Sequence, residues 1–587
     1  MWSALAAVLC AIMALAKAEE MVVMEPSVKV FSSNFWIKDD YSVSNLDTVN
    51  AVFIMKHNKD RLFSFERELV ERSTPTSGMY GHWFSREQVF QRLAPSSGDV
   101  NTVLSFLKSH GIPDEDVKMG HFRDIIRVKI PAMTAQTMLQ TEFSRFRSES
   151  QRNVTIYRVT QPYSLPAAVA EVVQVVDGIV RFPAVAGPLV SYGAESAEAT
   201  GLSVDQDLFK SCGGDCNGLM TPDAIGRLYD IPRATSSEDG NGIAVAEFQE
   251  EYADLDSVDD LLANCGRRDP SGSSASFMSM KGTEGKGRCE GLSCAEAQMD
   301  IQYTAALAAP IPTTVWYMDH FSAISWLDDL TSAHTRPLVA SVSFSLDSDA
   351  QVSAEYMDAT SAQFMKAGAM GITLLVASGD HGVWGHAGFG SGDKFHPEFP
   401  ASSPYVTTVG GTNLQTKSTT GAESAWTCSG GGFSEHFLQP TWQSPAVDAY
   451  LQRTRSTGLL PPTSYFNIEG RGYPDISAVG GQTNPFCVSL GDELFVGAAG
   501  TSGSTSVVAS IIALLNNERL REGKSSLGFI NPLLYANPEC FRDVQDYSRN
   551  SCLPSVSDGF ISVPGWDPAS GLGSPNYKCL LEAIRKY

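Results

Sequence analysis

From residue 242 onwards, short apolar runs alternate with longer stretches that have the composition of helices. The apolar runs are rich in Val, Ile, Leu and Ala, as at 242–248, 314–318, 338–344 and 372–377. Helix-like stretches lie between them, at 295–308 and 353–369. Buried strands that alternate with helices are typical of a parallel sheet with helices on both faces. The sequence therefore predicts an α/β domain, with its active site beyond the carboxyl ends of the strands.

The chain has 587 residues, too many for one ordinary domain. Residues 1–18 form an apolar run that ends in Ala16-Lys17-Ala18, which predicts a cleaved secretory signal peptide. The run is too short to span a bilayer, so a membrane anchor is the less favoured interpretation. No later stretch has the length and apolar character of a membrane span.

Residues 19–183 contain no cysteine and combine helix-like with strand-like patterns, which predicts a small α+β domain. We expect helices at 85–93 and 101–107 and strands at 124–130 and 154–159. Asn153 begins a glycosylation sequon in this domain. Residues 184–218 are rich in Ala, Gly and Ser and are predicted to be a linker that is open to proteolytic cleavage. Residues 219–587 make up the α/β domain.

Ten cysteines remain after the signal peptide, and an even number in a secreted chain indicates disulfides. Zinc is an alternative for the pairs Cys212/Cys216 and Cys289/Cys294, but these pairs have neither the CxxC spacing nor nearby histidines. The formal net charge of the chain is −23. Residues 19–200 are near balance at −3, whereas residues 201–587 carry −21. Such an acidic domain argues against nucleic acid or an anionic membrane as a partner and is compatible with an acidic compartment.

The triplet Gly500-Thr501-Ser502 opens a helix-like run of small and apolar residues, as at the nucleophile turn of a serine hydrolase. A serine nucleophile needs a base, and histidine is the usual one. The available candidates are His381 and His386, but His381 follows a late strand and no helix-forming run comes after it. This placement argues against a subtilisin-like histidine base.

Glu296 and Asp300 offer a different base. Residues four apart lie on one face of a helix, and two carboxyls there titrate as a pair. A Glu that is oriented by an Asp can accept the proton of Ser502, with a preference for acid pH. On its own, the spacing is more typical of a solvated helix face.

Several further segments occur with these motifs in a fixed order, and together they resemble the sedolisin family of serine-carboxyl peptidases. They are 296–303, 377–380, 399–412, 429–434, 471–477 and 500–502, with 80–84 and 164–167 in the first domain. The resemblance covers nearly the whole chain after the signal peptide. It implies a subtilisin-like catalytic domain that follows a small, ferredoxin-like propeptide domain.

The resemblance also implies a role for each matching residue. Ser502 is expected to be the nucleophile and Glu296 the general base, which then protonates the leaving amine. Asp300 orients Glu296, and Asp380 forms the oxyanion hole with the backbone N–H of Ser502. A carboxyl group can donate to an oxyanion only when it is protonated, so the chemistry favours acid.

One structural Ca²⁺ ion is expected in the C-terminal loops. The resemblance assigns its ligands to the side chains of Asp543 and Asp567 and to the carbonyls of Val544, Val563 and Gly565. Oxygen ligands of this kind suit a hard cation. Val563 stands where relatives often have glycine, but a carbonyl ligand does not require glycine.

The favoured function is an acid-active serine-carboxyl peptidase that is made as a zymogen. The segments 460–467 and 565–576 are most similar to the branch of the family that releases tripeptides from free N-termini of peptides or unfolded proteins. A sedolisin-type endopeptidase is the alternative, while a histidine-dependent hydrolase and a noncatalytic binding protein are less favoured. The propeptide is expected to inhibit its own catalytic domain. The signal peptide leaves lysosome, vacuole and extracellular space open.

Overall fold

The structure is a computed structural model, and it describes most of the chain. The described residues are 20–28, 31, 36–148, 154–182, 216, 219–248, 251–265, 278–282, 294–318, 322–347, 352–385, 394–415, 422–483, 485–491, 495–553 and 558–587. The expected signal peptide, the sequon asparagine Asn153, His386 and the linker 184–218, Cys216 apart, lie outside these ranges or at their margins. Contacts divide the chain into two compact units, which we describe separately.

The first unit comprises residues 1–58, 93–182 and 353–359. Its central sheet is antiparallel, in the order β4 (Val117–Met119), β5 (Ile125–Pro131), β3 (Thr48–Met55) and β9 (Val173–Asp177). Helices α4 (Ser97–Ser109), α5 (Ala132–Leu139) and α6 (Ala167–Val172) contribute to its apolar core. A βαββαβ chain with this strand order is the ferredoxin-like arrangement, so the α+β prediction is confirmed.

Smaller sheets complete the first unit. Strand β6 (Phe143–Ser148) lies between β2 (Trp36–Lys38) and β7 (Thr155–Val159), and β1 (Met21–Val23) pairs with β8 (Ser164–Pro166). The strands predicted at 124–130 and 154–159 are therefore present as β5 and β7, and the helix predicted at 101–107 is part of α4.

Residues 59–92 also precede the predicted linker, but their contacts group them with the second unit. They form α2 (Lys59–Ser73) and most of α3 (Arg86–Leu93), the helix predicted at 85–93. Trp83 Nε1 donates to the carbonyl of Ser526 at 2.8 Å, and Phe84 N donates to the carbonyl of Ala369 at 2.8 Å. No motif in the sequence predicted this association.

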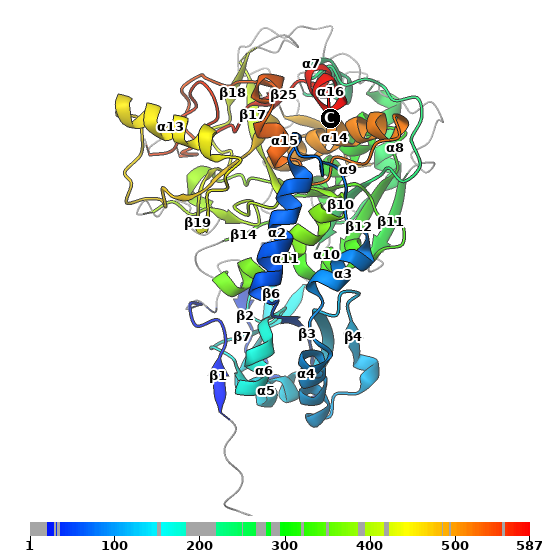
Figure 1. The fold of residues 1–587 in the computed structure, drawn as a ribbon, viewed down its shortest axis with the longest axis vertical. Coiled ribbons are helices and arrows are strands. Elements are labelled where there is room, and N and C mark those ends of the chain that lie inside the picture. Colours follow the sequence, from blue (N-terminus) through cyan, green and yellow to red (C-terminus); the bar gives the residue numbers. More distant parts are fainter. Residues whose placement is uncertain are drawn as a thin grey trace, which may run out of the picture. The chain divides into compact units, whose positions relative to one another are not determined.

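The core of the second unit is an eight-stranded sheet (Figure 1). Its order is β11 (Met278–Gly282), β12 (Thr313–Met318), β10 (Ile243–Phe248), β13 (Val339–Val342), β15 (Thr373–Ala377), β17 (Thr407–Leu414) and β18 (Glu423–Ala425), and β21 (Ile476–Val479) also pairs with β17. All of these pairs are parallel except β17 with β18. The predicted parallel α/β sheet is confirmed.

Two long helices bring the predicted catalytic segments together. Helix α14 (Thr501–Arg521) packs against α9 (Ala295–Ala308) and against β13, β15, β17 and β21. Almost every residue of α14 and every residue of α9 is buried. Small residues such as Gly503 and Ser504 permit this packing. A Cβ on Gly503 would meet the ring of Phe486.

The remaining elements of the second unit surround this centre. The helices are α7 (Pro222–Leu228), α8 (Leu255–Asn264), α10 (Ala323–Ser332), α11 (Ala354–Ala369), α13 (Ser444–Thr457), α15 (Asn531–Tyr535) and α16 (Tyr577–Arg585). Four short antiparallel pairs are β14 (Leu346–Asp347) with β16 (Glu398–Phe399), β19 (Gly432–Leu438) with β20 (Gly470–Tyr473), β22 (Phe486–Ser489) with β23 (Phe495–Ala498), and β24 (Phe541–Arg542) with β25 (Ser574–Pro575).

Disulfides cross-link the second unit, as predicted from the even number of cysteines. The described pairs are Cys216–Cys487, Cys428–Cys552 and Cys540–Cys579, and Cys265 and Cys294 are also disulfide-bonded. Such bonds persist in the oxidising secretory pathway, which agrees with the predicted entry into that pathway. Within the described ranges, none of the helices has the length and apolar character needed to cross a membrane.

Candidate active site

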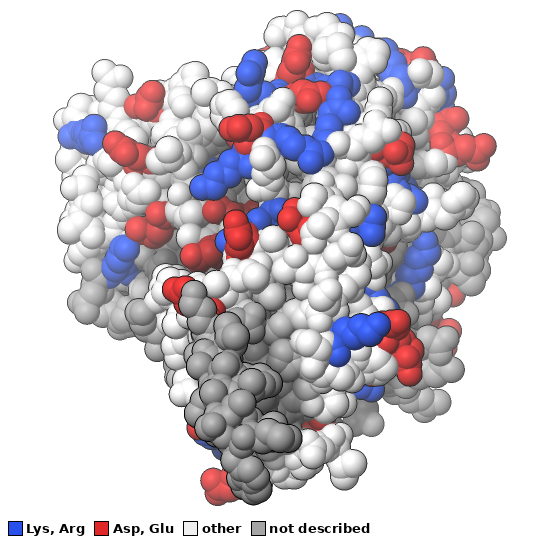
Figure 2. All heavy atoms as spheres, turned by 60° about the horizontal axis from the view of Figure 1, so that its bottom comes forward, with Lys and Arg blue, Asp and Glu red and all other residues white. Residues whose placement is uncertain are grey.

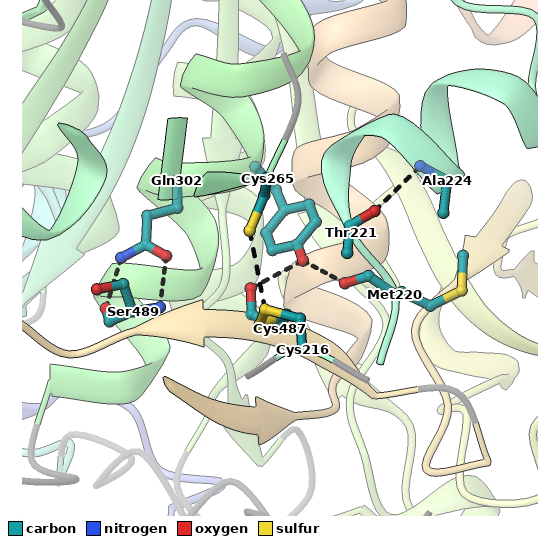
Figure 3. The surroundings of a disulfide bond; sticks show 9 residues. Cys216, Met220, Thr221, Ala224, Cys265, Gln302, Cys487 and Ser489 are labelled. Atoms are coloured by element: carbon teal, nitrogen blue, oxygen red, sulfur yellow. Dashed lines mark hydrogen bonds between the residues drawn. A yellow bond between two sulfur atoms is a disulfide. The ribbon is translucent and has the colours of Figure 1, made fainter. Parts of the chain in front are cut away.

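Helix α9 is held in place by side chains in its middle. Gln302 makes two hydrogen bonds with the backbone of Ser489 on β22: its Nε2 donates to the carbonyl at 2.6 Å, and its Oε1 accepts from the N–H at 3.0 Å (Figure 3). The hydroxyl of Tyr303 lies 2.5 Å from the Met220 carbonyl and 2.9 Å from the Cys487 carbonyl. These contacts fix the position of the two carboxyl residues in the first half of the helix.

The predicted nucleophile and base meet where α9 packs against the start of α14. Ser502 is the second residue of α14 and is 5% exposed. Its hydroxyl lies close enough to the carboxyl group of Glu296 to lower the pKa of that carboxyl. Asp300 lies one turn further along α9 and accepts a short hydrogen bond from the hydroxyl of Ser343, at the end of β13. The structure therefore places Ser502, Glu296 and Asp300 in one continuous cluster.

Asp380 lies beside Thr501, the residue before Ser502, and beyond the carboxyl end of β15. Its Oδ1 accepts hydrogen bonds from the backbone N–H and the hydroxyl of Thr501, each at 2.9 Å. The N–H of Gly379 in turn donates to the Thr501 hydroxyl at 3.2 Å. Gly379 has a φ of +101°, a conformation that favours glycine. The loop that carries Asp380 is thus bonded directly to the residue before Ser502.

Burial raises the pKa of each of these three carboxyls. The pKa of Glu296 is raised well above its ordinary value by burial and by the negative charge of Asp300, and the nearby Ser502 hydroxyl opposes this rise. Burial raises the pKa of Asp300 to about 7, against the bond from Ser343. Burial raises the pKa of Asp380 to about 6, against both bonds from Thr501. All three groups therefore favour the protonated state over a wider acid range than a solvated carboxyl.

Two further carboxyls belong to this cluster and were missed in the sequence. Glu251 accepts a hydrogen bond from the N–H of Ala297 in the first turn of α9, at 3.3 Å, and burial raises its pKa to about 8. Glu247 is wholly buried in β10, and its carboxyl oxygens have no hydrogen-bond partner among the described residues. Burial, with the charges of Asp300, Glu251 and Glu296, raises its pKa well above the ordinary value. An ionisable residue near the end of an otherwise apolar strand was the available sign.

The histidine alternative has less support from the geometry. His381 is followed by a single 3₁₀ turn, Gly382–Trp384, rather than by a long helix. The ionisable side chain on the neighbouring helix whose pKa the Ser502 hydroxyl affects is Glu296. His386 lies outside the described residues.

The predicted calcium ligands lie around one turn of the C-terminal loops. Gly565 N donates to Asp543 Oδ2 at 2.7 Å, and Val563 N donates to Asp567 Oδ2 at 2.9 Å. Asp567 is fully buried, and its Oδ1 also accepts from the backbone of Ala569 and Ser570. Burial raises its pKa well above the ordinary value despite these bonds. Two carboxyls beside one turn, one of them buried, fit the donor chemistry of a hard cation.

Sulfur atoms form a separate cluster, made of Cys216, Cys265 and Cys487. The Sγ atoms of Cys216 and Cys265 are 3.7 Å apart, beside the Cys216–Cys487 disulfide (Figure 3). Because these cysteines are disulfide-bonded, the cluster does not offer thiolates to zinc.

Comparison with known proteins gives the family. Residues 37–182 match the pro-kumamolisin activation domain, and residues 307–525 match the subtilase family. The chain is 33% identical to tripeptidyl-peptidase 1 of Rattus norvegicus, over 92% of both chains. It is 30% identical to physarolisin of Physarum polycephalum, over 94% of this chain and 97% of the relative.

A solved structure of Pseudomonas sedolisin, a serine-carboxyl proteinase complexed with pseudo-iodotyrostatin, is also similar. It is 21% identical with a TM-score of 0.49, over 63% of this chain and 98% of that chain. The matches to tripeptidyl-peptidase 1 and physarolisin decide the family, because each relative is at least 30% identical to this chain over nearly the whole length of both chains. The chain belongs to the sedolisin family of serine-carboxyl peptidases, and it carries the activation domain of that family.

Proposed function

We propose that this protein hydrolyses peptide bonds in acid with Ser502 as nucleophile and Glu296 as its base. The carrying observation is the proximity of the Ser502 hydroxyl to a buried Glu296 carboxyl that shares a helix face with Asp300. Because the two carboxyls are close and buried, the pair retains a proton over a wide pH range while its other member is ionised. The ionised form accepts the serine proton.

In this mechanism, Ser502 Oγ attacks the carbonyl carbon of the scissile bond as its proton passes to Glu296. The resulting oxyanion accepts hydrogen bonds from the protonated Asp380 carboxyl and from the Ser502 backbone N–H, at the positive end of α14. Glu296 then gives its proton to the leaving amine, and an acyl-enzyme ester forms on Ser502. Water, deprotonated by Glu296, attacks this ester, and Glu296 returns the proton to Ser502 Oγ as the ester bond breaks and the acid product leaves.

Release of tripeptides from free N-termini is the favoured mode of cleavage. It is supported by the similarity to proteins named tripeptidyl-peptidase 1. A sedolisin-type endopeptidase is the second candidate, since the Pseudomonas sedolisin is named only as a serine-carboxyl proteinase. The activation domain is proposed to cover the catalytic unit until acid conditions release it. We infer that the enzyme works in an acidic lysosome or vacuole, or after secretion into an acidic medium.

We also propose one structural Ca²⁺ ion in the C-terminal loops. The side chains of Asp543 and Asp567 and the carbonyls of Val544, Val563 and Gly565 would hold it. The ion would supply positive charge beside the buried Asp567 carboxylate and would stabilise these loops.

The test is product analysis with the full chain. The protein is acidified to about pH 4, where Asp380 is protonated, and given a peptide with a free N-terminus. Mass spectrometry should show successive loss of three residues, and Ser502→Ala and Glu296→Gln should each abolish it. The exposed Ser456→Ala and Glu582→Gln are matched controls that should keep full activity. Internal cuts would make the protein an endopeptidase, and full activity of Glu296→Gln would refute the proposed base.

A further inference from the structure

A buried carboxyl group lies against the loop that leads to Asp380. Glu398 is the first residue of β16, is 4% exposed, and pairs with Asp347 of β14. Its Oε2 accepts a hydrogen bond from Ser345 Oγ at 2.8 Å, and its N–H donates to the Tyr473 hydroxyl at 3.0 Å. These contacts hold the carboxyl in one place.

Two loops connect Glu398 to the proposed catalytic residues. The first loop carries Ser345, which bonds to Glu398, and Ser343, which bonds to Asp300. The second loop carries Gly379 directly before Asp380. A Cβ built on Gly379 would lie 2.7 Å from the carboxyl carbon of Glu398, so the carboxyl occupies the space that a side chain at 379 would need.

The substrate residue before the scissile bond must pass this point. Its carbonyl oxygen would lie between Asp380 and the Ser502 N–H, so its side chain begins a few bonds from the loop of Gly379. The side chain that precedes the cut is therefore the part of the substrate nearest to Glu398. This placement rests on the proposed catalytic function.

We propose that Glu398 determines specificity and selects lysine or arginine immediately before the cut. The carboxylate would form a charge-assisted hydrogen bond with the cationic end of that side chain, in surroundings that exclude most water. Ser345 and Tyr473 position the Glu398 backbone and carboxyl for this contact. If three residues are released at a time, the preferred tripeptides end in a basic residue.

The experiment compares arginine with citrulline, a neutral residue of nearly the same shape. Fluorogenic tripeptides with a free N-terminus and arginine, citrulline or leucine before the leaving group are cleaved by the activated enzyme at acid pH. The kcat/KM for arginine should exceed that for citrulline by about tenfold or more, as expected for one charge-assisted bond. In Glu398→Gln, this ratio should fall close to one while cleavage of the leucine substrate persists. The exposed Glu469→Gln should keep the wild-type ratio.

Each other result has a defined meaning. A wild-type ratio near one, or a ratio that Glu398→Gln leaves unchanged, overturns the proposal but keeps the peptidase. Absence of cleavage of all three substrates by wild type, in a preparation that also leaves a long peptide uncut, means that the catalytic proposal itself has failed. If the long peptide is cut, the same comparison is made with long peptides that carry arginine, citrulline or leucine before the cut. If Glu398→Gln does not fold, tripeptide aldehydes ending in argininal or citrullinal are compared as inhibitors of the wild type. Equal inhibition constants would then overturn the role of Glu398.

Discussion

At Asp380, burial and one neighbouring residue together set the pH at which the carboxyl loses its proton. Burial raises the pKa to about 6, and the two hydrogen bonds from Thr501 limit that rise. A protonated Asp380 can donate to an oxyanion, whereas an ionised Asp380 would repel it. The proposed mechanism therefore requires activity to fall as the pH rises through about 6.

Thr501→Val tests this relation with a side chain of the same shape. Loss of the hydroxyl removes an interaction that lowers the pKa of Asp380, so the alkaline limb of the pH–kcat/KM profile should move to higher pH. The maximal rate should fall by about tenfold, the effect of one lost hydrogen bond of about 1.4 kcal/mol. The profile is measured with one tripeptide substrate between pH 3 and pH 8. A shift of the limb to lower pH would contradict the assignment.

Asp380→Asn gives a second view of the same residue. The amide donates a hydrogen bond at every pH, so the alkaline limb near pH 6 should disappear while some activity remains. Asp380→Ala, which has no donor, should lose about 10²- to 10³-fold in kcat, as expected for a missing oxyanion-hole donor. If Asp380→Asn keeps the wild-type profile, another group controls that limb.

Some residues of the candidate site could be predicted from the sequence, and others could not. The spacing of Glu296 and Asp300 placed them on one helix face, and the structure brings Ser502 to that face. Glu247, Glu251 and Glu398 were not singled out, because none of them belongs to a recognisable motif. Only the packing reveals that these carboxyls are buried, and that Glu247 lies near Glu251, Glu296 and Asp300.

Helix α9 contains both Glu296 and Asp300, and its position depends on contacts with β22. The reciprocal pair between Gln302 and Ser489 ties the middle of the helix to a strand far along the chain (Figure 3). Any shift of α9 moves Glu296 relative to Ser502 on α14. Precise placement matters because catalytic geometry tolerates displacements of only about 0.5 Å.

Gln302→Leu should therefore lower both stability and activity. The change leaves the buried N–H and carbonyl of Ser489 without their partner, at a cost of about 1–3 kcal/mol for each group. We expect a lower free energy of unfolding in urea and a reduced kcat with little change in KM. Tyr303→Phe, which removes one shared hydroxyl, is the milder comparison and should cost about 1 kcal/mol. Unchanged stability in Gln302→Leu would show that the pair does not hold the helix.

The loops around Asp543 and Asp567 should depend on the proposed Ca²⁺ ion for part of their stability. A chelator should lower the melting temperature, and added Ca²⁺ should restore it. Asp567→Asn should melt at the lower temperature in either condition. Differential scanning fluorimetry measures the melting temperature without an activity measurement, and Glu582→Gln serves as the control. No response to chelator or calcium in the wild-type chain would refute the site.

The regular elements could be predicted from the sequence because each is long and strongly patterned. The helix at 295–308 and the strand at 372–377 were found nearly to their ends. The short pairs β14 with β16 and β22 with β23 were not predicted, since two to four residues carry too little pattern. Their pairing depends on tertiary packing, and these same pairs position Glu398 and α9.

At the scale of the whole molecule, net charge and buried carboxyls both depend on pH in the same direction. The formal net charge is −23 at pH 7, and protonation reduces the repulsion that this charge causes. On the face shown in Figure 2, acidic and basic side chains are interspersed, so the excess does not form one acidic patch there. The buried carboxyls of the active site add a separate contribution.

Stability should accordingly be greater in acid than at neutral pH. Asp380 and Asp300 have ordinary pKa values of 3.8, raised to about 6 and about 7 in the fold. Below pH 4 both states are protonated, and as the pH rises to about 7 the unfolded chain loses these protons first. The free energy of unfolding should fall on the order of several kcal/mol over that range, at about 1.4 kcal/mol per pKa unit.

The measurement uses the Ser502→Ala chain, which cannot cleave itself. Its urea midpoint should be higher at pH 4.5 than at pH 7, and Asp300→Asn with Asp380→Asn should flatten this dependence. A higher midpoint at pH 7 in the Ser502→Ala chain would mean that other groups dominate.

The Cys216–Cys487 disulfide has a consequence for the way the zymogen is divided into two chains. Cys216 lies near the end of the segment 184–218, where the activating cut is predicted. A cut before Cys216 leaves this cysteine on the catalytic chain, whereas a cut after it leaves the cysteine on the propeptide side. In the second case, the severed propeptide would stay covalently bound to the enzyme that it inhibits. Electrophoresis of the acidified protein with and without reductant separates the two outcomes, and only a cut on the N-terminal side gives an enzyme that can lose its inhibitor by dilution.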